Sequence, residues 1–517
     1  MSALEVLRDA DGPHAGVRVF AGYRAPIRER CQVLVVGSGP GGAVVAKELA
    51  EAGKDVILVE EGPPFAARDF RPEAGTVLRR TFREGGMRVA RGNGFFPTMQ
   101  AIGLGGGSLV NSAISVRAPG WALDKWATHG ASGIHAGALD DDYAAVESFL
   151  GIEDTHEDVL GERNRLFKRG CDALGYSSAP TPRNVRGCKG SGECFTGCRN
   201  GAKQSTDISY VPAAIRAGAR VLSSVRVDAI TSDGKRATGA RGRVIEPFTW
   251  NEGHEVEISA DVVVLAAGCM ATPCILAKSG LGNASGHLGR HLHGHPGLAV
   301  CAIFDHRVDP WTGATQGYHS LQFLEEGMKL EVLWAPPAIL SVRFPGFGRE
   351  LKEHLMQFDH TAPFDVFCNA GYSEGSVRPS SFGKQPDIRF QLDQRDVDLL
   401  KRGLLLLGDI CWAAGATKVL PGVHGVPDVL TSKDDQRALA DFPMKATDVT
   451  VGMNHVFGTT RMGDDAKESV VDGHGRVHGT PNVWVADTGV FAGSPAVNPM
   501  LTCMALARRT ARAIASA

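Results

Sequence analysis

Closely spaced glycines near the start of the chain can hold a phosphate group through backbone atoms alone. Residues 37–42 form a G-x-G-x-x-G pattern, and two acids follow the next apolar run. Glycine permits a tight turn and close approach of the backbone to a pyrophosphate, and a carboxylate placed there can accept hydrogen bonds from ribose hydroxyls. The pattern predicts a dinucleotide site made of Gly37, Ser38, Gly39, Pro40, Gly41, Gly42, Glu60 and Glu61.

The flanking sequence supplies the elements that would position this turn. Residues 31–36 are apolar and short, as expected of a buried parallel strand. Residues 43–52 contain helix formers without internal Gly or Pro, Gly53 ends them, and residues 55–59 form a second apolar run. A glycine pattern alone is weak, but one framed by strand, helix, strand and acid is specific for dinucleotide binding. Which dinucleotide binds stays open at this point.

Three neighbouring cysteines, Cys188, Cys194 and Cys198, can bind a metal or form a disulfide. Zinc or an iron–sulfur cluster would use such thiolates, but a fourth ligand is missing nearby and the spacing is not typical of zinc. We therefore predict a structural loop, with room for one disulfide, and no metal site.

Composition and charge exclude several classes of function. The chain has 517 residues, a net charge of −2 and a pI near 6.8, which gives no bulk attraction to nucleic acid or to an anionic membrane. The first residues lack a basic start followed by an apolar run, and the apolar stretch at 403–416 is short and contains Asp409. Neither a signal peptide nor a transmembrane helix is predicted. We expect a cytoplasmic protein of two or more domains.

Nucleotide-binding features recur far from the first turn, which predicts a discontinuous domain. Residues 261–268 resemble a buried strand ending in glycine, followed by a helix with Thr272 as N-cap and Pro273 in its first turn. Residues 483–486 predict a last strand, with Asp487 at its carboxyl end, where ligands of parallel sheets bind. We assign residues 31–120, 200–300 and 450–517 to one discontinuous nucleotide-binding domain, 1–30 to an N-terminal arm and 121–199 to a cap or linker.

Residues 301–449 differ in pattern and predict a second, substrate-binding domain. Alternating residues at 329–333 and 387–392 indicate antiparallel strands, and 397–414 indicates one amphipathic helix. Glu331, on an otherwise apolar strand, is a candidate pocket carboxylate. Several large apolar side chains can form a core or a lipophilic pocket, of which a core is favoured: Leu333, Trp334, Phe344, Phe347, Phe364 and Phe367.

Further segments, taken with the glycine turn, resemble the glucose–methanol–choline (GMC) family of FAD-dependent oxidoreductases over nearly the whole chain. Residues 103–111 (GLGGGSLVN) and 268–282 (GCMATPCILAKSGLG) are similar to two family signatures. Residues 287–296 (HLGRHLHGHP) are similar to a third family segment, and His455 and Asn498 are similar to the catalytic histidine and its partner. The chain departs from the usual pattern at Ile102, Cys269 and His291.

The resemblance implies an α/β fold, with a Rossmann-like FAD-binding domain of the GMC or glutathione-reductase type and a substrate domain with an antiparallel sheet and helices. It implies noncovalent FAD, because residues 109–111 offer no histidine to tether the flavin. The implied cofactor residues are Gly105, Gly106, Gly107, Ser108, Asn111 and Ile114 near the isoalloxazine, Val227 at the adenine, Asp487 at the ribityl or pyrophosphate, and Pro499 and Met500 at the flavin pyrimidine.

The implied reaction is oxidation of the CH–OH group of an alcohol. A histidine with a pKa near 6.5 suits a base at neutral pH, so His455 is the candidate base, and Asn498 would hold the substrate oxygen. His293 and His295 are expected only to pack between domains. Resemblance to the cholesterol oxidase and long-chain-alcohol oxidase branch predicts a lipophilic long-chain or alicyclic alcohol, with O2 or a separate electron acceptor. Two alternatives stay open: a hydroxynitrile-lyase-like enzyme with structural FAD, and a flavin photodecarboxylase.

Overall fold

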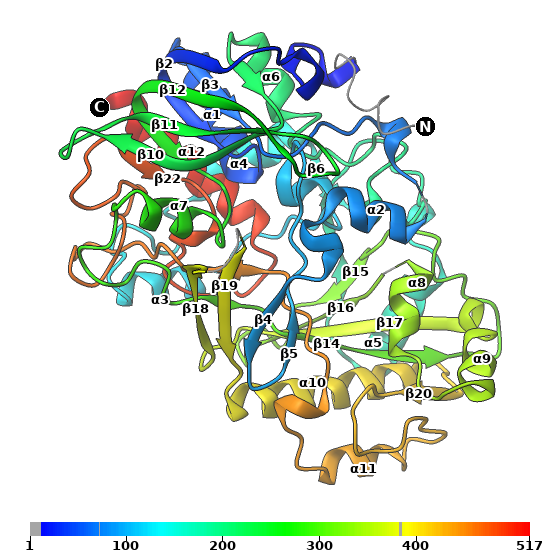
Figure 1. Ribbon diagram of the computed structural model, residues 1–517. Coiled ribbons are helices and arrows are strands. Elements are labelled where there is room, and N and C mark those ends of the chain that lie inside the picture. The colour runs from blue at the N-terminus through cyan, green and yellow to red at the C-terminus, as the bar shows by residue number, and fades with distance from the viewer. Residues whose placement is uncertain (1–11, 72, 335, 382–384) are drawn as a thin grey trace.

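The computed structural model describes residues 12–71, 73–334, 336–381 and 385–517, which fold into two halves with different sheets. Figure 1 shows a nucleotide half at the top, containing both ends of the described chain, and a substrate half below it. The fold is mixed α/β, as predicted. Among the residues that the structure describes, no helix is both long and apolar enough to cross a bilayer.

The nucleotide half is built on an eight-stranded sheet whose central strands are parallel. The parallel strands lie in the order β1 (Val17–Arg18), β9 (Arg220–Leu222), β3 (Val56–Val59), β2 (Ile27–Val36), β12 (Glu252–Leu265) and β22 (Val483–Val485). The long β12 pairs with β22 at its end and, at its start, with an antiparallel extension of β11 (Ala237–Ile245) and β10 (Val225–Ser232). The predicted strand–helix–strand unit and the last strand are therefore confirmed.

Helix α1 (Pro40–Glu51) follows β2 directly and packs against α12 (Met500–Ser516) and α6 (Tyr210–Arg216). Its first residue is a proline, whose missing N–H costs nothing at a helix start. The next residue has to be glycine, because a Cβ on Gly41 would lie 1.7 Å from the carbonyl oxygen of Ala486. The turn is therefore held against the end of β22 by direct backbone contact.

The substrate half is built on a six-stranded antiparallel sheet. Its strands lie in the order β20 (Lys418–Leu420), β14 (Gly297–Ile303), β17 (Thr361–Cys368), β16 (Met328–Val332), β15 (Tyr318–Ser320) and β7 (Ala179–Pro180). Helices α10 (Gln394–Ala413) and α5 (Glu162–Leu174) cover the lower face of this sheet (Figure 1). Alternate side chains of β16 and β17 therefore point to the helices or to the opposite face.

Three smaller groups of strands lie outside these two sheets in the described residues: one four-stranded sheet and two pairs, β13 (His293–Gly294) with β21 (Val456–Phe457) and β6 (Ile152–Asp154) with β8 (Pro182–Asn184). The four-stranded sheet has the order β18 (Glu374–Pro379), β19 (Pro386–Gln391), β4 (Val89–Gly92) and β5 (Phe95–Pro97). The remaining α-helices are α2 (Ala74–Thr81), α3 (Gly120–Thr128), α4 (Asp140–Leu150), α7 (Thr272–Lys278), α8 (Pro337–Leu340), α9 (Arg349–Leu355) and α11 (Gln436–Asp441).

Several boundaries differ from those expected from the sequence. The residue before α7 is Ala271, so the prediction of Thr272 as N-cap was wrong; its hydroxyl instead donates to the carboxylate of Asp487. Helix α10 begins earlier than predicted because the side chain of Asp393 caps it by accepting from the N–H of Arg395. Strand β1, from the expected arm, forms an edge of the nucleotide sheet.

Candidate active site

One cavity of about 1040 Å³ runs between the two halves and is lined by residues of both sheets. Most of the residues predicted from the sequence meet on its walls. These are Gly37, Gly39, Pro40, Gly41, Glu60, Glu61, Gly106, Gly107, Asn111, Ile114, Val227, His455, Asp487, Asn498, Pro499 and Met500. The structure thus brings together segments from the beginning, the middle and the end of the chain.

Four predicted residues, Ser38, Gly42, Gly105 and Ser108, lie behind the cavity wall. The hydroxyl of Ser38 donates to Glu60 Oε2 over 2.7 Å and accepts from the N–H of Gly105 over 2.9 Å. The hydroxyl of Ser108 donates to the carbonyl of Gly105 over 2.7 Å. These residues join the two glycine-rich turns to each other rather than facing the cavity.

The nucleotide wall presents bare backbone and helix starts, which is what a phosphate-containing cofactor requires. A Cβ on Gly107 would meet no atom within 4 Å, and one on Gly39 would meet only the Cα of Gly106 at 3.9 Å, so both positions leave room for a ligand. Helices α1 and α12 both begin at this wall, at Pro40 and Met500. Their free N–H groups and partial positive charge favour anionic groups.

The two acids of the nucleotide wall already have hydrogen-bond partners. Glu60 accepts from the N–H groups of Ser38 and Gly62, at 3.0 and 2.9 Å. Asp487 accepts from the N–H groups of Gly268 and Gly489, at 3.0 and 2.8 Å. Burial raises the pKa of both carboxyls, and these hydrogen bonds oppose the rise.

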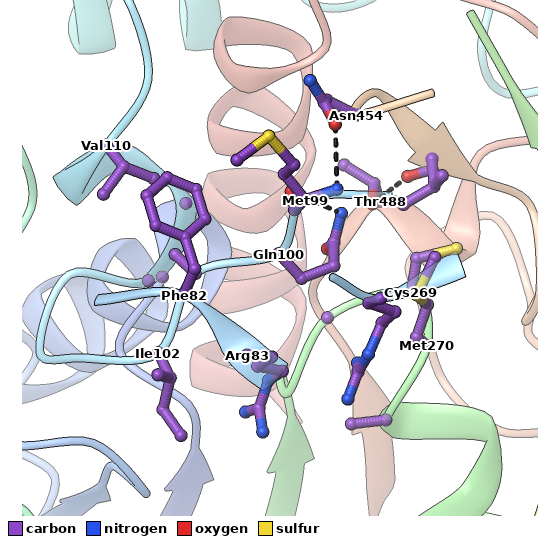
Figure 2. A pocket seen from close by; sticks show the side chains of 18 of the residues that line it. Phe82, Arg83, Met99, Gln100, Ile102, Val110, Cys269, Met270, Asn454 and Thr488 are labelled. Carbon is purple, nitrogen blue, oxygen red and sulfur yellow. Dashed lines mark hydrogen bonds between the residues drawn. The ribbon is translucent and has the colours of Figure 1, made fainter. Parts of the chain in front are cut away.

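A segment after β5 forms a further part of the wall. Figure 2 shows Met99 and Gln100 lying beside Asn454, and the N–H of Met99 donates to Asn454 Oδ1 over 2.9 Å. On the other side of the segment, Arg83 donates to Glu61 over 2.7 Å. This contact uses one oxygen of an acid that was predicted to bind the cofactor.

His455 and Asn498 meet on the substrate side, where a buried lysine sets the orientation of the amide. Lys329 Nζ donates to Asn498 Oδ1 over 2.6 Å, and the lysine side chain is 0 % exposed. Because an ammonium can only donate, Oδ1 must face Lys329, so Nδ2 faces His455 Nε2 at 3.5 Å. His455 therefore presents Nε2 as an acceptor.

The tautomers of two adjacent histidines follow from this arrangement. With Nε2 as an acceptor, His455 carries its proton on Nδ1, which lies 3.3 Å from Nδ1 of His295. His295 then accepts at Nδ1 and donates from Nε2 to the hydroxyl oxygen of Ser494 over 2.8 Å. The ring of His295 also stacks on Phe367. His295 thus contacts the candidate base directly, which goes beyond the interdomain packing expected of it.

The environment keeps His455 neutral. Burial and, second, the nearby ammonium of Lys329 lower the pKa of His455 to about 4. Burial together with His455 and Lys329 lowers the pKa of His295 as well. A neutral imidazole with a free lone pair on Nε2 is the form that can take a proton.

Sequence reasoning did not identify Lys329 or His295 as site residues, although the strand that contains Lys329 carries a signal. Lys329 and Glu331 alternate with apolar residues on β16, so two charged side chains share one face of a buried strand. Glu331 lines the cavity, as predicted. Of the large apolar side chains, Leu333, Trp334 and Phe367 line the cavity, Phe344 and Phe364 belong to the core, and Phe347 is 92 % exposed.

The cysteine-rich loop contains no disulfide, since Cys188, Cys194 and Cys198 are all free thiols. Arg183 donates to the sulfur of Cys194 over 3.1 Å. The adjacent Lys203 donates to the carbonyls of Leu109, Asn111 and Cys194 over 2.8–2.9 Å. The loop therefore supports the second glycine turn from behind.

The departure at His291 has a local explanation. This residue has a φ of +56°, which most side chains avoid, and its Nδ1 lies 2.7 Å from Oε1 of Glu374. His291, His293 and Glu374 bring possible ligand atoms within 4.8 Å of one another outside the cavity. His293 Nδ1 also contacts the carbonyl of Ser373 at 3.0 Å, so the cluster ties β13 to β18.

A parallel sheet with a glycine turn is joined through one cavity to a histidine–asparagine pair beside a second sheet, which is the arrangement of a two-part enzyme that binds a nucleotide. Two family models described as GMC oxidoreductase match residues 78–297 and 371–507, and an FAD binding domain model matches residues 30–84. The chain belongs to the GMC oxidoreductase family. It is an enzyme, and its dinucleotide is FAD.

Known relatives agree with this assignment. An uncharacterized GMC-type oxidoreductase of Mycobacterium tuberculosis is 34 % identical over 509 residues, covering 96 % of this chain and 78 % of the relative. A long-chain-alcohol oxidase of Arabidopsis thaliana is 27 % identical over 511 residues, covering 93 % of this chain and 66 % of that protein. Pyridoxine 4-oxidase from Mesorbium loti has the same fold, with a TM-score of 0.71 at 19 % identity, covering 93 % of this chain and 99 % of that one.

Proposed function

We propose that this enzyme oxidises the CH–OH group of an alcohol, with His455 as the base and Asn498 as the group that holds the substrate oxygen. The observation that carries the proposal is the fixed orientation of the pair, in which Lys329 turns the amide so that Nδ2 faces His455 Nε2. The likeness to plant long-chain-alcohol oxidases supports an alcohol as substrate.

An alcohol oxygen placed between the two side chains would meet a donor and an acceptor at once. Its proton would pass to His455 Nε2, while Nδ2 of Asn498 donates to the oxygen and stabilises the developing charge. Bound FAD supplies the acceptor for the hydride, which leaves the carbon that bears this oxygen. Loss of the proton and the hydride leaves a carbonyl product.

His295 would assist by holding the imidazole in place. It accepts from Nδ1–H of His455, so Nε2 stays available for the substrate proton before transfer, and the contact persists after it. The hydrogen bond that His295 donates to Ser494 holds the ring of His295 in place in turn. Both rings would therefore be positioned before substrate binds.

The cofactor would lie along the nucleotide wall without a covalent bond. The turn at residues 37–42 and the start of α1 would bind the pyrophosphate, and the start of α12, at Pro499 and Met500, would face the flavin. Val227 would contact the adenine. Leu333, Trp334 and Phe367 support the predicted lipophilic substrate. Glu331 and Asp365 line the same cavity and favour additional polar groups in that substrate.

Anaerobic mixing of the FAD-loaded enzyme with a panel of alcohols tests the proposal. We expect the absorbance of oxidised flavin to bleach with at least one alcohol, and admission of air then distinguishes O2 from a separate acceptor. Cleavage of a cyanohydrin without bleaching would contradict the proposal in favour of a lyase. Light-dependent loss of CO2 from a fatty acid would contradict it in favour of a photodecarboxylase.

A further inference from the structure

On the substrate side, the cavity is bounded by one face of the six-stranded sheet. Residues that are directly opposite on β16 and β17 form rows across this face. On β16 and β17, Lys329 is opposite Phe367, and Glu331 is opposite Asp365. All but Lys329 line the cavity. Residues two apart on a strand share a face and are about 7 Å apart. The row of Glu331 and Asp365 therefore lies one step beyond the row that contacts His455 and Asn498.

The first row, Lys329 and Phe367, contacts the two residues proposed to carry out the reaction. Lys329 contacts Asn498, and Phe367 packs edge-on against the ring of His455, with 5.5 Å between ring centroids. A reacting carbon held by the histidine–asparagine pair therefore lies above this row. A substrate group about 7 Å farther along the strands would therefore contact the second row, Glu331 and Asp365.

The second row contains a carboxylate without a hydrogen-bond partner among the described residues. Asp365 lines the cavity, its Oδ1 is buried, and neither of its oxygens accepts a hydrogen bond from another residue in the part of the chain that the structure describes. Burial and the adjacent Glu331 raise the pKa of Asp365 well above its ordinary value. Two acids directly opposite on neighbouring strands are unfavourable, and a buried acceptor left without a donor is costly. A donor from the substrate would remove the second of these penalties.

Lys329, Glu331 and Gln316, the neighbouring polar groups, are hydrogen-bonded to one another. Glu331 accepts from Lys329 and, through Oε1, from Gln316 Nε2 over 2.8 Å. Arg343 also lines the cavity, has no hydrogen bond or ion pair in the part of the chain that the structure describes, and is close enough for its charge to lower the pKa of Asp365 in part. With two cations, Lys329 and Arg343, near this row, a neutral hydroxyl is a better partner for Asp365 than an ammonium group.

We propose that Asp365 and Glu331 form a second binding subsite, which accepts a hydroxyl group of the substrate about 7 Å from the reacting carbon. The physiological substrate is then a polyhydroxy alcohol rather than a purely lipophilic one. Asp365 is the specificity-determining residue, and Gln316 completes the subsite through its Oε1, which accepts no hydrogen bond from the residues that the structure describes. This inference rests on the alcohol oxidation proposed above.

Matched pairs of alcohols test the subsite in the FAD-loaded enzyme under anaerobic conditions. We expect butane-1,4-diol and pentane-1,5-diol to reduce the flavin about 10-fold or more faster, per unit concentration, than butan-1-ol and pentan-1-ol. Ethane-1,2-diol is too short to reach both rows and should show no such advantage over ethanol. 5-Aminopentan-1-ol should be poorer than pentane-1,5-diol.

Variants assign the preference to one side chain. Asp365→Leu should bring diols and monoalcohols within about twofold of each other while monoalcohol oxidation persists, because only the acceptor for the second hydroxyl is lost. Asp365→Asn, which keeps the shape, should change the ratio in the same direction and guards against misfolding of the leucine variant. Asp434→Leu, a matched change at an exposed site, should leave the ratio unchanged.

The outcomes separate this inference from the proposed function. Bleaching by monoalcohols and diols alike, or a diol preference that survives in both Asp365 variants, would overturn the subsite and leave alcohol oxidation standing. A preference for the amino alcohol would overturn the hydroxyl assignment. A complete absence of bleaching across the panel would overturn the proposed function itself.

Discussion

The two walls of the cavity are organised in opposite ways. On the nucleotide wall, Glu60 and Asp487 already accept hydrogen bonds from backbone N–H groups, so the ligand meets backbone and helix starts. On the substrate wall, Asp365 has a buried oxygen that no described residue contacts by a hydrogen bond, and Lys329 orients Asn498. The acids of the nucleotide wall are thus hydrogen-bonded before the ligand binds, whereas the substrate wall has an acceptor that a ligand would have to satisfy.

The largest effect is expected where the nucleotide wall is packed most tightly. Gly41→Ala would place a Cβ 1.7 Å from the carbonyl oxygen of Ala486, so the turn must shift away from the cofactor. We expect loss of nearly all bound FAD, measured as the ratio of flavin to protein absorbance. Gly107→Ala is the matched control for folding, since its Cβ meets no protein atom; it should fold normally and bind FAD more weakly. Full FAD content in Gly41→Ala would contradict the description of this wall.

A smaller effect is expected where the substrate wall depends on one charge. Lys329→Met removes the donor that orients Asn498, and we expect flavin reduction near neutral pH to slow about 10-fold. It also removes a positive charge that opposes protonation of His455, so the pKa of that histidine should rise from about 4. Because the base must be neutral, the acid limb of the rate profile should move to higher pH.

The pH profile needs a control for the acid left behind. Lys329→Met leaves Glu331 without its ion partner, so the double variant Lys329→Met/Glu331→Leu removes both charges together. The acid limb should move in the same direction in both variants. An acid limb that stays where it is in the wild-type enzyme would show that Lys329 does not act on His455.

The two walls also differ in how far the sequence predicts them. The nucleotide turn, α1 and β3 come from one continuous stretch, so local patterns were enough to predict them and the residues that line the cavity. Lys329 and Asn498 are 169 positions apart, and His295 and His455 are 160 apart. Their contacts depend on the register of β16 and on the pairing of β13 with β21, which no local pattern specifies.

Two predictions from residue type differ from the structure because other side chains contact the residues concerned. Thr272 has the residue type of an N-cap, yet its hydroxyl donates to Asp487, a residue contributed by a distant strand. The cysteine-rich loop had room for a disulfide, but Arg183 and Lys203 contact its members instead. A long-range contact replaced the expected cap at Thr272, whereas in the loop two basic side chains of the same segment contact Cys194.

The last prediction of this comparison concerns the nucleotide wall and asks whether denatured protein releases its flavin. If backbone and helix starts bind FAD without a covalent bond, acid or heat denaturation should release all of the flavin into the supernatant. Residues 109–111 offer no histidine for a tether. Yellow precipitated protein that keeps its flavin through washing would contradict noncovalent binding.

The most direct test of the central claim is single-turnover reduction of the flavin by an alcohol in His455→Ala. We predict that reduction slows by about 100-fold or more while FAD stays bound, because the substrate proton loses its acceptor. His474→Ala, at an exposed histidine outside the cavity, should reduce at the wild-type rate. Reduction of His455→Ala at a rate near that of the wild type would contradict the assignment of His455 as the base.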